Sequence, residues 1–261
     1  FVKPYVKTNK NDFNDAEAIC EAVTRPNMRF VPIKKVSQQD MQSLHRIRSQ
    51  LIQSRTAKAN QVRGLLAEYG IVIPKDIHNV RKMLPIILED VENELSCLMR
   101  RELHNLYTDL LNLDNRIEKE EIAIKEIYNS NESCKRISEI EGIGMLTATA
   151  VVSAIGDPST FKNGRAFSAW LGLVPKQSSS GNKQMLLGIS KRGDKYLRSL
   201  LVHGARSVVY RANSKSDKRS IWISELKKRR GANKTCVAVA NKNARIIWAV
   251  LSKNEEYRKA A

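Results

Sequence analysis

Residues 99–127, MRRELHNLYTDLLNLDNRIEKEEIAIKEI, carry apolar side chains at alternating steps of three and four. Eight of nine such positions are apolar, with Glu120 as the exception: Met99, Leu103, Leu106, Leu110, Leu113, Ile117, Ile124 and Ile127. This spacing predicts a coiled coil or a long helical hairpin, packed on another helix of the chain or on a second copy. A seam of Leu and Ile carries no chemistry, so we expect its role to be spacing, dimerisation or both.

Helical patterning continues on both sides of this seam. Residues 37–69 contain no proline and a single glycine, and their apolar residues recur at helical spacing. Residues 11–23 and 234–251 have the same character. Short extended pieces are expected only near the N-terminus, at residues 1–6 and 30–33. The sequence therefore predicts a mainly α protein.

The charge distribution indicates a polyanionic partner. The 261 residues include 45 Lys and Arg against 27 Asp and Glu, which gives a net charge of +18. Residues 131–261 hold 25 Lys and Arg against 9 Asp and Glu, whereas residues 1–130 hold 20 against 18. A positive field of this kind attracts nucleic acid by releasing counterions. A membrane surface is the weaker alternative, because the basic residues are not confined to one amphipathic helix.

Composition also excludes several classes of protein. The hydrophobic fraction of 42% is typical of a globular chain and argues against disorder. The longest nearly uncharged apolar stretch, residues 145–156, is shorter than the roughly 18 residues of a membrane span. The four cysteines form no CxxC pair, which argues against a disulfide framework or a zinc ribbon. We therefore expect a cytoplasmic, nucleoid-associated protein with no membrane contact.

Asp12 and Asp15 are candidate metal ligands. They stand three residues apart in KNDFNDAEA, which on a helix places both carboxylates on one face. Two adjacent carboxylates suit a hard cation such as Mg²⁺. In the alternative interpretation Asp12 caps the helix and Asp15 faces solvent, and spacing alone favours that alternative.

Gly142 and Gly144 lie between two apolar helical runs in a pattern that resembles a helix-hairpin-helix. In such a motif the glycines let the backbone approach a phosphate, and the second helix presents its free N–H groups. A tight turn that needs glycine for positive φ is the alternative, and the two interpretations are compatible. The basic surroundings favour contact with the DNA backbone.

A serine-rich segment, QSSSGN at residues 177–182, precedes the basic run 188–198. Composition alone favours a flexible loop. The functional interpretation is a serine hydroxyl held at a loop tip among cations that stabilise charge developing at phosphorus. Those cations are Lys183, Lys191, Arg192 and Arg198. Because His203 is the only histidine in residues 131–261, a Ser-His-Asp triad is poorly supported.

Three segments together carry a family resemblance: KNDFNDAEAICEAV at 10–23, IEGIGMLTATAVVSAIGD at 140–157, and FSAWLGLVPKQSSSGNKQMLLGISKRGDKYLRSLLVHGAR at 167–206. In this order, with long helices between them, they resemble the DEDD transposases of the insertion-sequence-one-ten family. These are mobile-element recombinases related to the Piv-type DNA invertases. The resemblance extends from Pro4 to about Tyr210.

The resemblance implies an RNase H-like (Holliday-junction-resolvase-like) domain whose four acids bind Mg²⁺, then a coiled coil and a C-terminal helical domain with a nucleophilic serine. It implies strand exchange through a covalent phosphoserine in a homo-oligomer, dimer or tetramer, with a structured RNA from the element guiding the choice of DNA. On this chain, residues 1–75 would be the C-terminal part of the RNase H-like domain and residues 76–132 the coiled coil. Residues 133–261 would form an all-helical domain with the helix-hairpin-helix-like motif and the serine loop.

By this resemblance Asp12 and Asp15 are the third and fourth acids and ligands of Mg²⁺. Ser180 is the nucleophile, with Ser179 as the alternative, because the triple serine of residues 178–180 leaves the register open. The resemblance also suggests that Lys191 and Arg192 contact the scissile phosphate or the DNA. The residues expected to bind nucleic acid are Gly142, Gly144, Lys183, Lys191, Arg192 and Arg198.

The first Asp and the Glu of the family would precede Asp12, and residues 1–11 contain no acidic side chain. We therefore expect these 261 residues to bind nucleic acid without recombining DNA. The first hypothesis is a DNA transposase or site-specific recombinase that uses Mg²⁺-assisted attack by serine on DNA phosphodiesters. The second is a truncated, inactive DNA- or RNA-binding remnant of such an enzyme. The third is a coiled-coil scaffold whose basic half docks acidic partners.

Overall fold

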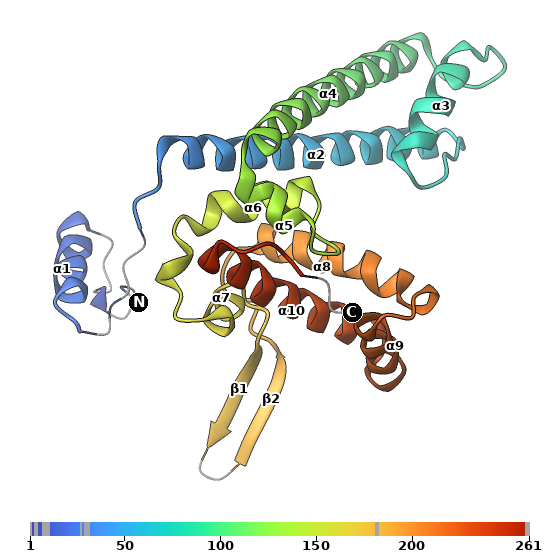
Figure 1. Cartoon of the computed structure of the whole chain (residues 1–261). Coiled ribbons are helices and arrows are strands. Elements are labelled where there is room, and N and C mark those ends of the chain that lie inside the picture. Colours follow the sequence, from blue (N-terminus) through green and yellow to red (C-terminus); the bar gives the residue numbers. More distant parts are fainter. Residues whose placement is uncertain are drawn as a thin grey trace. The chain divides into compact units, whose positions relative to one another are not determined.

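The computed structural model describes residues 2, 5–6, 11–26, 28, 32–180 and 183–258 (Figure 1). The chain divides into two compact parts, residues 1–34 and 35–261. The first part contains helix α1 (Asp12–Val23), which confirms the helix expected there. The Asn11 side chain caps α1 by accepting a hydrogen bond from the Phe13 amide at 3.0 Å.

The second part is a set of helices and one β-hairpin. The helices are α2 (Val36–Glu68), α3 (Ile77–Glu89), α4 (Cys97–Ser130), α5 (Glu132–Ser138), α6 (Met145–Ile155), α7 (Gly164–Trp170), α8 (Lys195–Arg211), α9 (Lys218–Arg230) and α10 (Ala232–Lys253), with short 3-10 turns at Pro158–Thr160 and Ala212–Ser214. Strands β1 (Pro175–Ser180) and β2 (Lys183–Ile189) pair in antiparallel orientation. The predicted mainly α class is confirmed. Among the described residues, no helix is both long and apolar enough to cross a membrane.

Helices α2 and α4 form a long antiparallel hairpin (Figure 1). The four residues of α4 that lie seven apart in the predicted seam are at most 5% exposed: Leu103, Leu110, Ile117 and Ile124. Three ion pairs cross the interface: Arg48 with Glu121, Arg55 with Asp114, and Lys58 with Asp109. Residue numbers rise along α2 as they fall along α4, so the pairs fix the antiparallel direction. The seam therefore packs on a helix of its own chain.

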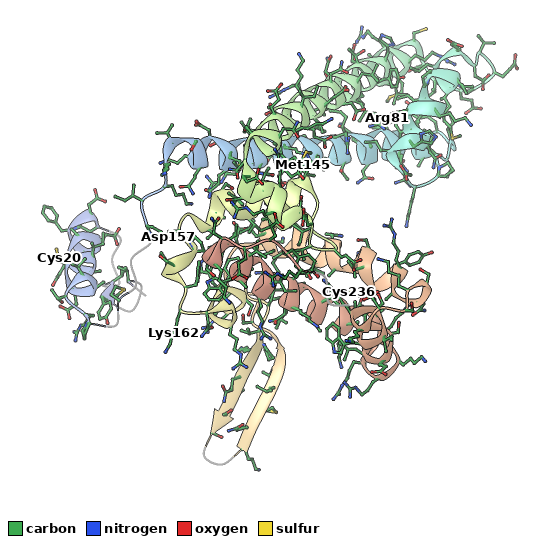
Figure 2. All side chains as sticks on the ribbon, viewed as in Figure 1. Cys20, Arg81, Met145, Asp157, Lys162 and Cys236 are labelled. Atoms are coloured by element: carbon green, nitrogen blue, oxygen red, sulfur yellow. The ribbon has the colours of Figure 1, made fainter. Side chains whose placement is uncertain are left out.

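Helix α3 closes the far end of this hairpin. Arg81, labelled in Figure 2, donates to both carboxylate oxygens of Asp114, at 2.7 and 2.5 Å. Asp114 also accepts from Arg55, so one carboxylate ties α2, α3 and α4 together. Sequence analysis did not predict α3, because Pro85 interrupts its helical pattern.

Helices α5 to α10 share one hydrophobic core, and we call this part of the chain the helical body. Helix α10 packs on α7, α8 and α9 and contributes buried residues along its length, including Val239, Ala244 and Ile247. The helix expected over residues 234–251 is thereby confirmed. Residues on the first turns of α2 dock on this body, since Gln42 Nε2 donates to the Ser153 carbonyl of α6 at 2.8 Å.

His45 attaches α2 to α6 and α8. Thr149 Oγ1 donates to the Met145 carbonyl at 2.8 Å, which leaves this hydroxyl to accept from His45 Nε2–H at 3.0 Å. His45 Nδ1 then accepts from the Tyr196 hydroxyl, also at 3.0 Å. Burial and, to a smaller extent, the nearby Arg48 lower the pKa of His45 to about 4. The imidazole is therefore neutral and holds the hairpin on the body.

The turn between α5 and α6 lies directly on α8. Gly142 has φ +87°, and a Cβ built on Gly204 of α8 would lie 1.8 Å from the Gly142 carbonyl oxygen. Only hydrogen fits at Gly204, because the two backbones are in contact there.

Two expectations about strands differ from the structure. The C-terminal region is not all-helical, because residues 175–189 form the β-hairpin. The Gly181-Asn182 dipeptide between two short runs is a hairpin signal that the serine-rich composition obscured. At the N-terminus the described members of the two extended segments are not in strands, and the others lie outside the described residues. The compact division near residue 34 also differs from the predicted domain boundary at residue 75, which stays a prediction.

We predict that Gly204→Ala lowers the free energy of unfolding by more than about 2 kcal/mol, because the new methyl group would displace the Gly142 turn. Gly64→Ala is the matched control, since nothing lies within 4 Å of a Cβ at Gly64, which lies near the C-terminal end of α2. That control should gain about 0.5–1 kcal/mol from helix propensity. Denaturant unfolding of both variants measures the difference, and equal stability would contradict the contact.

The pKa of His45 also predicts a pH dependence. The unfolded chain protonates His45 below about pH 6.5, whereas the folded chain resists protonation down to about pH 4. The stabilisation from neutral His45 is thus complete above pH 6.5, and about 3 kcal/mol of it is lost as the pH falls through this window. In melting experiments His45→Gln should flatten this dependence. His104→Gln, which changes an exposed histidine of α4, is the control and should keep the pH dependence of stability seen in the wild type.

Candidate functional site

The candidate serine lies at the tip of the β-hairpin. Ser180 is the last residue of β1 and pairs with Lys183, the first residue of β2. Every residue of β1 is exposed, and Figure 1 shows the hairpin extending away from the helical body. The serine hydroxyl is therefore open to a large substrate such as a duplex.

The register of the hairpin separates the three serines. Side chains alternate between the faces of a strand, so Ser178 and Ser180 share one face with Met185 and Lys183. Ser179 points to the other face, where it pairs with Gln184 and its hydroxyl accepts a hydrogen bond from Gln177 Nε2 at 3.0 Å. Ser180 is thus the serine that pairs directly with a lysine residue.

A close backbone contact holds the base of the hairpin. The Ser190 amide donates to the Val174 carbonyl at 2.8 Å. Gly193 has φ +85°, and a Cβ there would lie 1.9 Å from the Trp170 carbonyl oxygen. Glycine is required at this position for the backbone conformation and for the close approach.

The basic residues of the ISKRG segment lie at this base and not around Ser180. Lys191 and Arg192 are exposed beside the turn. The five residue steps of β1, from Pro175 at the base to Ser180 at the tip, span about 17 Å, and Lys191 and Arg192 lie at or beyond that base. Arg198 holds the base together, because its Nη1 donates to the Leu171 and Arg192 carbonyls, both at 3.2 Å. The sequence predicted that all four cations surround Ser180. Because the segment forms an extended hairpin, only Lys183 of the four lies at the tip with Ser180, and the other three lie at the base.

Gly142 and Gly144 have different surroundings. Gly142 forms the turn that lies against α8, as described above. Gly144 is the exposed N-cap of α6, where no side chain makes a capping hydrogen bond. The first amide groups of α6 therefore carry the partial positive charge that suits a phosphate.

Asp12 and Asp15 occupy the first turn of α1 and both are exposed. Asn11 is the cap, so the interpretation of Asp12 as the cap is wrong. Two carboxylates are ligands of the type that Mg²⁺ prefers, and these side chains fit as part of such a site. The described residues contain no group of three or more acidic, His or Cys side chains that could complete it.

Cys134 and His45 do not add a catalytic group. Cys134 and Cys236 are buried, whereas Cys20 and Cys97 are exposed, and all four are free thiols. Burial raises the pKa of the Cys134 thiol to about 12, so it is protonated at neutral pH. His45 is neutral and hydrogen-bonded through both ring nitrogens.

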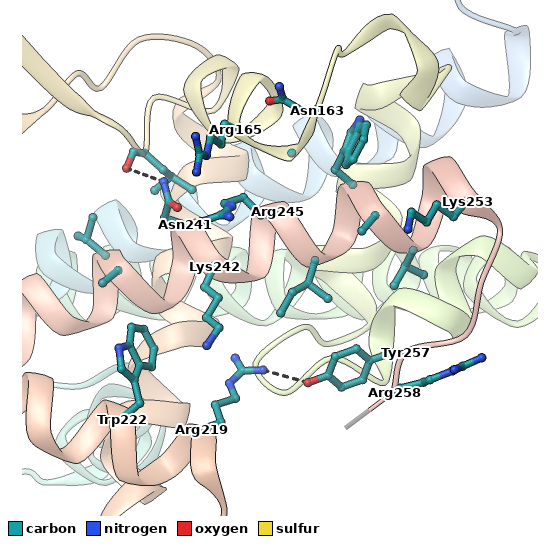
Figure 3. A pocket seen from close by; sticks show the side chains of 18 of the residues that line it. Asn163, Arg165, Arg219, Trp222, Asn241, Lys242, Arg245, Lys253, Tyr257 and Arg258 are labelled. Atoms are coloured by element: carbon teal, nitrogen blue, oxygen red, sulfur yellow. Dashed lines mark hydrogen bonds between the residues drawn. The ribbon is translucent and has the colours of Figure 1, made fainter. Parts of the chain in front are cut away.

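A groove that sequence analysis did not predict runs along α10, with a volume of about 1220 Å³ (Figure 3). The basic residues on its walls, besides Arg219, are Arg165, Lys234, Lys242, Arg245, Lys253 and Arg258. Glu255 and Glu256 are its acidic residues. The signal in the sequence is the polar face of residues 232–253, which carries several of these cations opposite the apolar residues that predicted the helix.

Comparison with known proteins identifies the family. A profile described as a transposase of the IS110 DEDD type matches residues 1–71, and one described as "Transposase IS116/IS110/IS902 family" matches residues 134–220. The chain is 51% identical over 257 residues to the transposase for insertion sequence element IS1111A of Coxiella burnetii. That alignment covers 98% of this chain and 71% of the relative.

Two other relatives are similar over almost the whole chain. A probable family 20 transposase of Pseudomonas aeruginosa is 48% identical, and the transposase for insertion sequence element IS1328 of Yersinia enterocolitica is 40% identical. Each alignment covers 99% of this chain and 77% of the relative. The chain therefore belongs to the IS110/IS116/IS902 family of transposases.

Proposed function

We propose that this chain carries the serine nucleophile of a DNA strand-exchange reaction, and that Ser180 is that residue. The observation that carries the proposal is the position of Ser180 at the exposed tip of a hairpin, opposite Lys183, in a chain of a transposase family. A nucleophile at a projecting tip reaches a phosphodiester without the helical body meeting the duplex.

In the proposed step Ser180 Oγ loses its proton and forms a bond to phosphorus. The bond from phosphorus to a deoxyribose oxygen breaks, and that oxygen takes a proton and leaves as a hydroxyl. Attack by a hydroxyl of another strand reverses the step and frees the serine. The Lys183 ammonium stabilises the negative charge that builds on the phosphoryl oxygens.

Asp12 and Asp15 would hold Mg²⁺, which when bound supplies Lewis-acid polarisation of the phosphate. These carboxylates and Ser180 belong to separate compact parts of the chain, and all three side chains are exposed. A homo-oligomer that brings the acids of one copy to the serine of another is consistent with this exposure, and we include it in the proposal.

Nucleic acid would be held by sites away from the tip. Lys191 and Arg192 lie exposed at the base of the hairpin, and the open N-terminus of α6 follows Gly144. Arg198 acts as a positioning residue, because its hydrogen bonds fix the loops that carry the other two cations. The excess of positive charge in residues 131–261 supports DNA and a structured guide RNA as partners.

The second candidate function is nucleic-acid binding without chemistry. It is favoured by the excess of positive charge in residues 131–261 and because the described residues hold no third side chain that would complete a metal site with Asp12 and Asp15. Under this proposal the polypeptide retains its basic surface and its hairpin but lacks the full metal site.

We predict that Ser180→Ala abolishes the covalent protein–DNA adduct in the transposase expressed from its whole gene, while DNA affinity changes less than twofold. Ser179→Ala is the matched control and should keep the adduct, because the Ser179 hydroxyl lies on the opposite face. Denaturing electrophoresis with labelled DNA measures the adduct. An adduct that survives Ser180→Ala but not Ser179→Ala would contradict the proposal and show that Ser179 is the nucleophile.

For the 261-residue polypeptide we predict DNA binding with a steep salt dependence and no Mg²⁺-dependent cleavage. Replacing both Lys191 and Arg192 with Gln should reduce the slope of log K against log salt by about two. Lys119→Gln, a single charge change on the exposed face of α4, should leave the slope unchanged. Filter binding over a salt series measures this, and a cleavage product would contradict the second part.

A further inference from the structure

Arg219 on α9 is an unusual cation at the floor of the α10 groove. It is 8% exposed, and none of the ion pairs among the described residues includes it. Its Nη2 donates to Asn243 Oδ1 at 2.5 Å, and its Nη1 donates to the Tyr257 hydroxyl at 3.3 Å. Its Nε is buried without a hydrogen-bond partner in the described structure.

A buried guanidinium with neutral partners is costly. Removing the charge from water is compensated only by an anion or by a complete set of hydrogen bonds. Asn243 and Tyr257 supply two neutral acceptors for a group with five N–H donors. The remaining charge is balanced when an anion enters the groove, so Arg219 marks a binding position for one.

The other walls of the groove identify the anion as nucleic acid. The groove is lined by seven Lys and Arg side chains and by only two glutamates. This excess of positive charge along its length suits a chain of phosphates better than a single small anion. Trp222 is half-buried beside Arg219 on α9, and the Lys242 ammonium lies 4.4 Å from the centre of its ring. A cationic groove with an aromatic ring is the arrangement that holds a single strand, since its unpaired bases can stack.

The groove is continuous with the base of the serine hairpin. Its lining includes Pro175 and Ile189, the residues at which β1 starts and β2 ends. Asn241 of α10 donates to the Leu173 carbonyl at 3.2 Å and so joins α10 to this base (Figure 3). Figure 3 also shows Lys242 of α10 and Arg219 of α9 pointing toward one another.

We propose that the α10 groove is a binding site for a single-stranded segment of nucleic acid, with a phosphate on Arg219 and Lys242 and a base against Trp222. This inference rests on the proposed function, because it adds a second nucleic-acid site beside the serine hairpin. Tyr257, from the segment after α10, accepts a hydrogen bond from Arg219 and so lies beside the proposed phosphate position.

The test measures the affinity of the 261-residue chain for labelled twelve-nucleotide probes by fluorescence anisotropy at fixed salt. The probes are oligo(dT), oligo(U) and a twelve-base-pair duplex. Lys242→Gln and Trp222→Leu should each weaken binding of the single strands about tenfold. The tighter of the two single-stranded probes identifies DNA or RNA as the occupant.

Lys228→Gln is the matched control, since it removes one exposed charge from α9 outside the groove. It should change single-strand affinity less than twofold, and duplex affinity should respond equally to all three variants. Single-strand losses no larger than those of Lys228→Gln would overturn the proposal. Duplex losses equal to the single-strand losses would also overturn it.

Photocrosslinking gives a readout that does not depend on substituting buried Arg219. A strand with 4-thiouracil or 4-thiothymine should attach to peptides that contain Trp222 or Tyr257, and crosslinks confined to the hairpin would contradict the groove. The result is independent of the covalent-adduct assay, because Ser180→Ala leaves the groove intact. An adduct that survives Ser180→Ala while the groove crosslinks form would contradict the serine proposal alone. An adduct lost in Ser180→Ala with no crosslinks in the groove would contradict the groove proposal alone.

Discussion

The backbone contact between the turn at Gly193 and the end of α7 determines where the candidate nucleophile lies. A Cβ at Gly193 would meet the Trp170 carbonyl at 1.9 Å, so the two turns touch without an intervening side chain. Arg198 bridges the same turns through two carbonyls. Because both ends of the serine hairpin leave from this contact, its rigidity sets the direction in which Ser180 is presented.

The same geometry separates two roles that share one short segment of sequence. Ser180 and Lys183 are at the tip, where charge at phosphorus would develop. Lys191 and Arg192 are at the base, at the other end of strands that span about 17 Å or more. A charge at that distance in water is screened and contributes little to a transition state, but it can hold a DNA backbone. Under the proposed function, positioning and chemistry are therefore divided between the two ends of the hairpin.

The groove along α10 and the hairpin meet at residues 173–175 and 189. The helical body thus presents two basic surfaces of different shape: a projecting tip and a concave channel. A projecting tip suits a duplex, and a channel with an aromatic wall suits a single strand. Strand exchange involves both forms of nucleic acid, so the two surfaces are complementary parts of one proposed function.

Sequence patterns predicted the long helices well. The seven-residue spacing of Leu103, Leu110 and Ile117 requires a helix with one buried stripe, and such a stripe is a local property of the chain. The same patterns missed α3, where Pro85 breaks the period, and the β-hairpin, whose residues are almost all exposed and carry no apolar alternation. A strand without a buried face leaves no signal in hydrophobic periodicity.

For the candidate site, the sequence by itself determined the acids, the serines, the basic half and the resemblance to a transposase family. Only the tertiary structure decided that Ser179 and Ser180 face opposite ways, that Arg198 is engaged with carbonyls, and that Arg219 is buried without a carboxylate. The physical reason is that charge and residue type are properties of each residue and can be read from the sequence. Burial and pairing depend on which segments meet, and here those segments are as far apart in sequence as Arg219 and Tyr257.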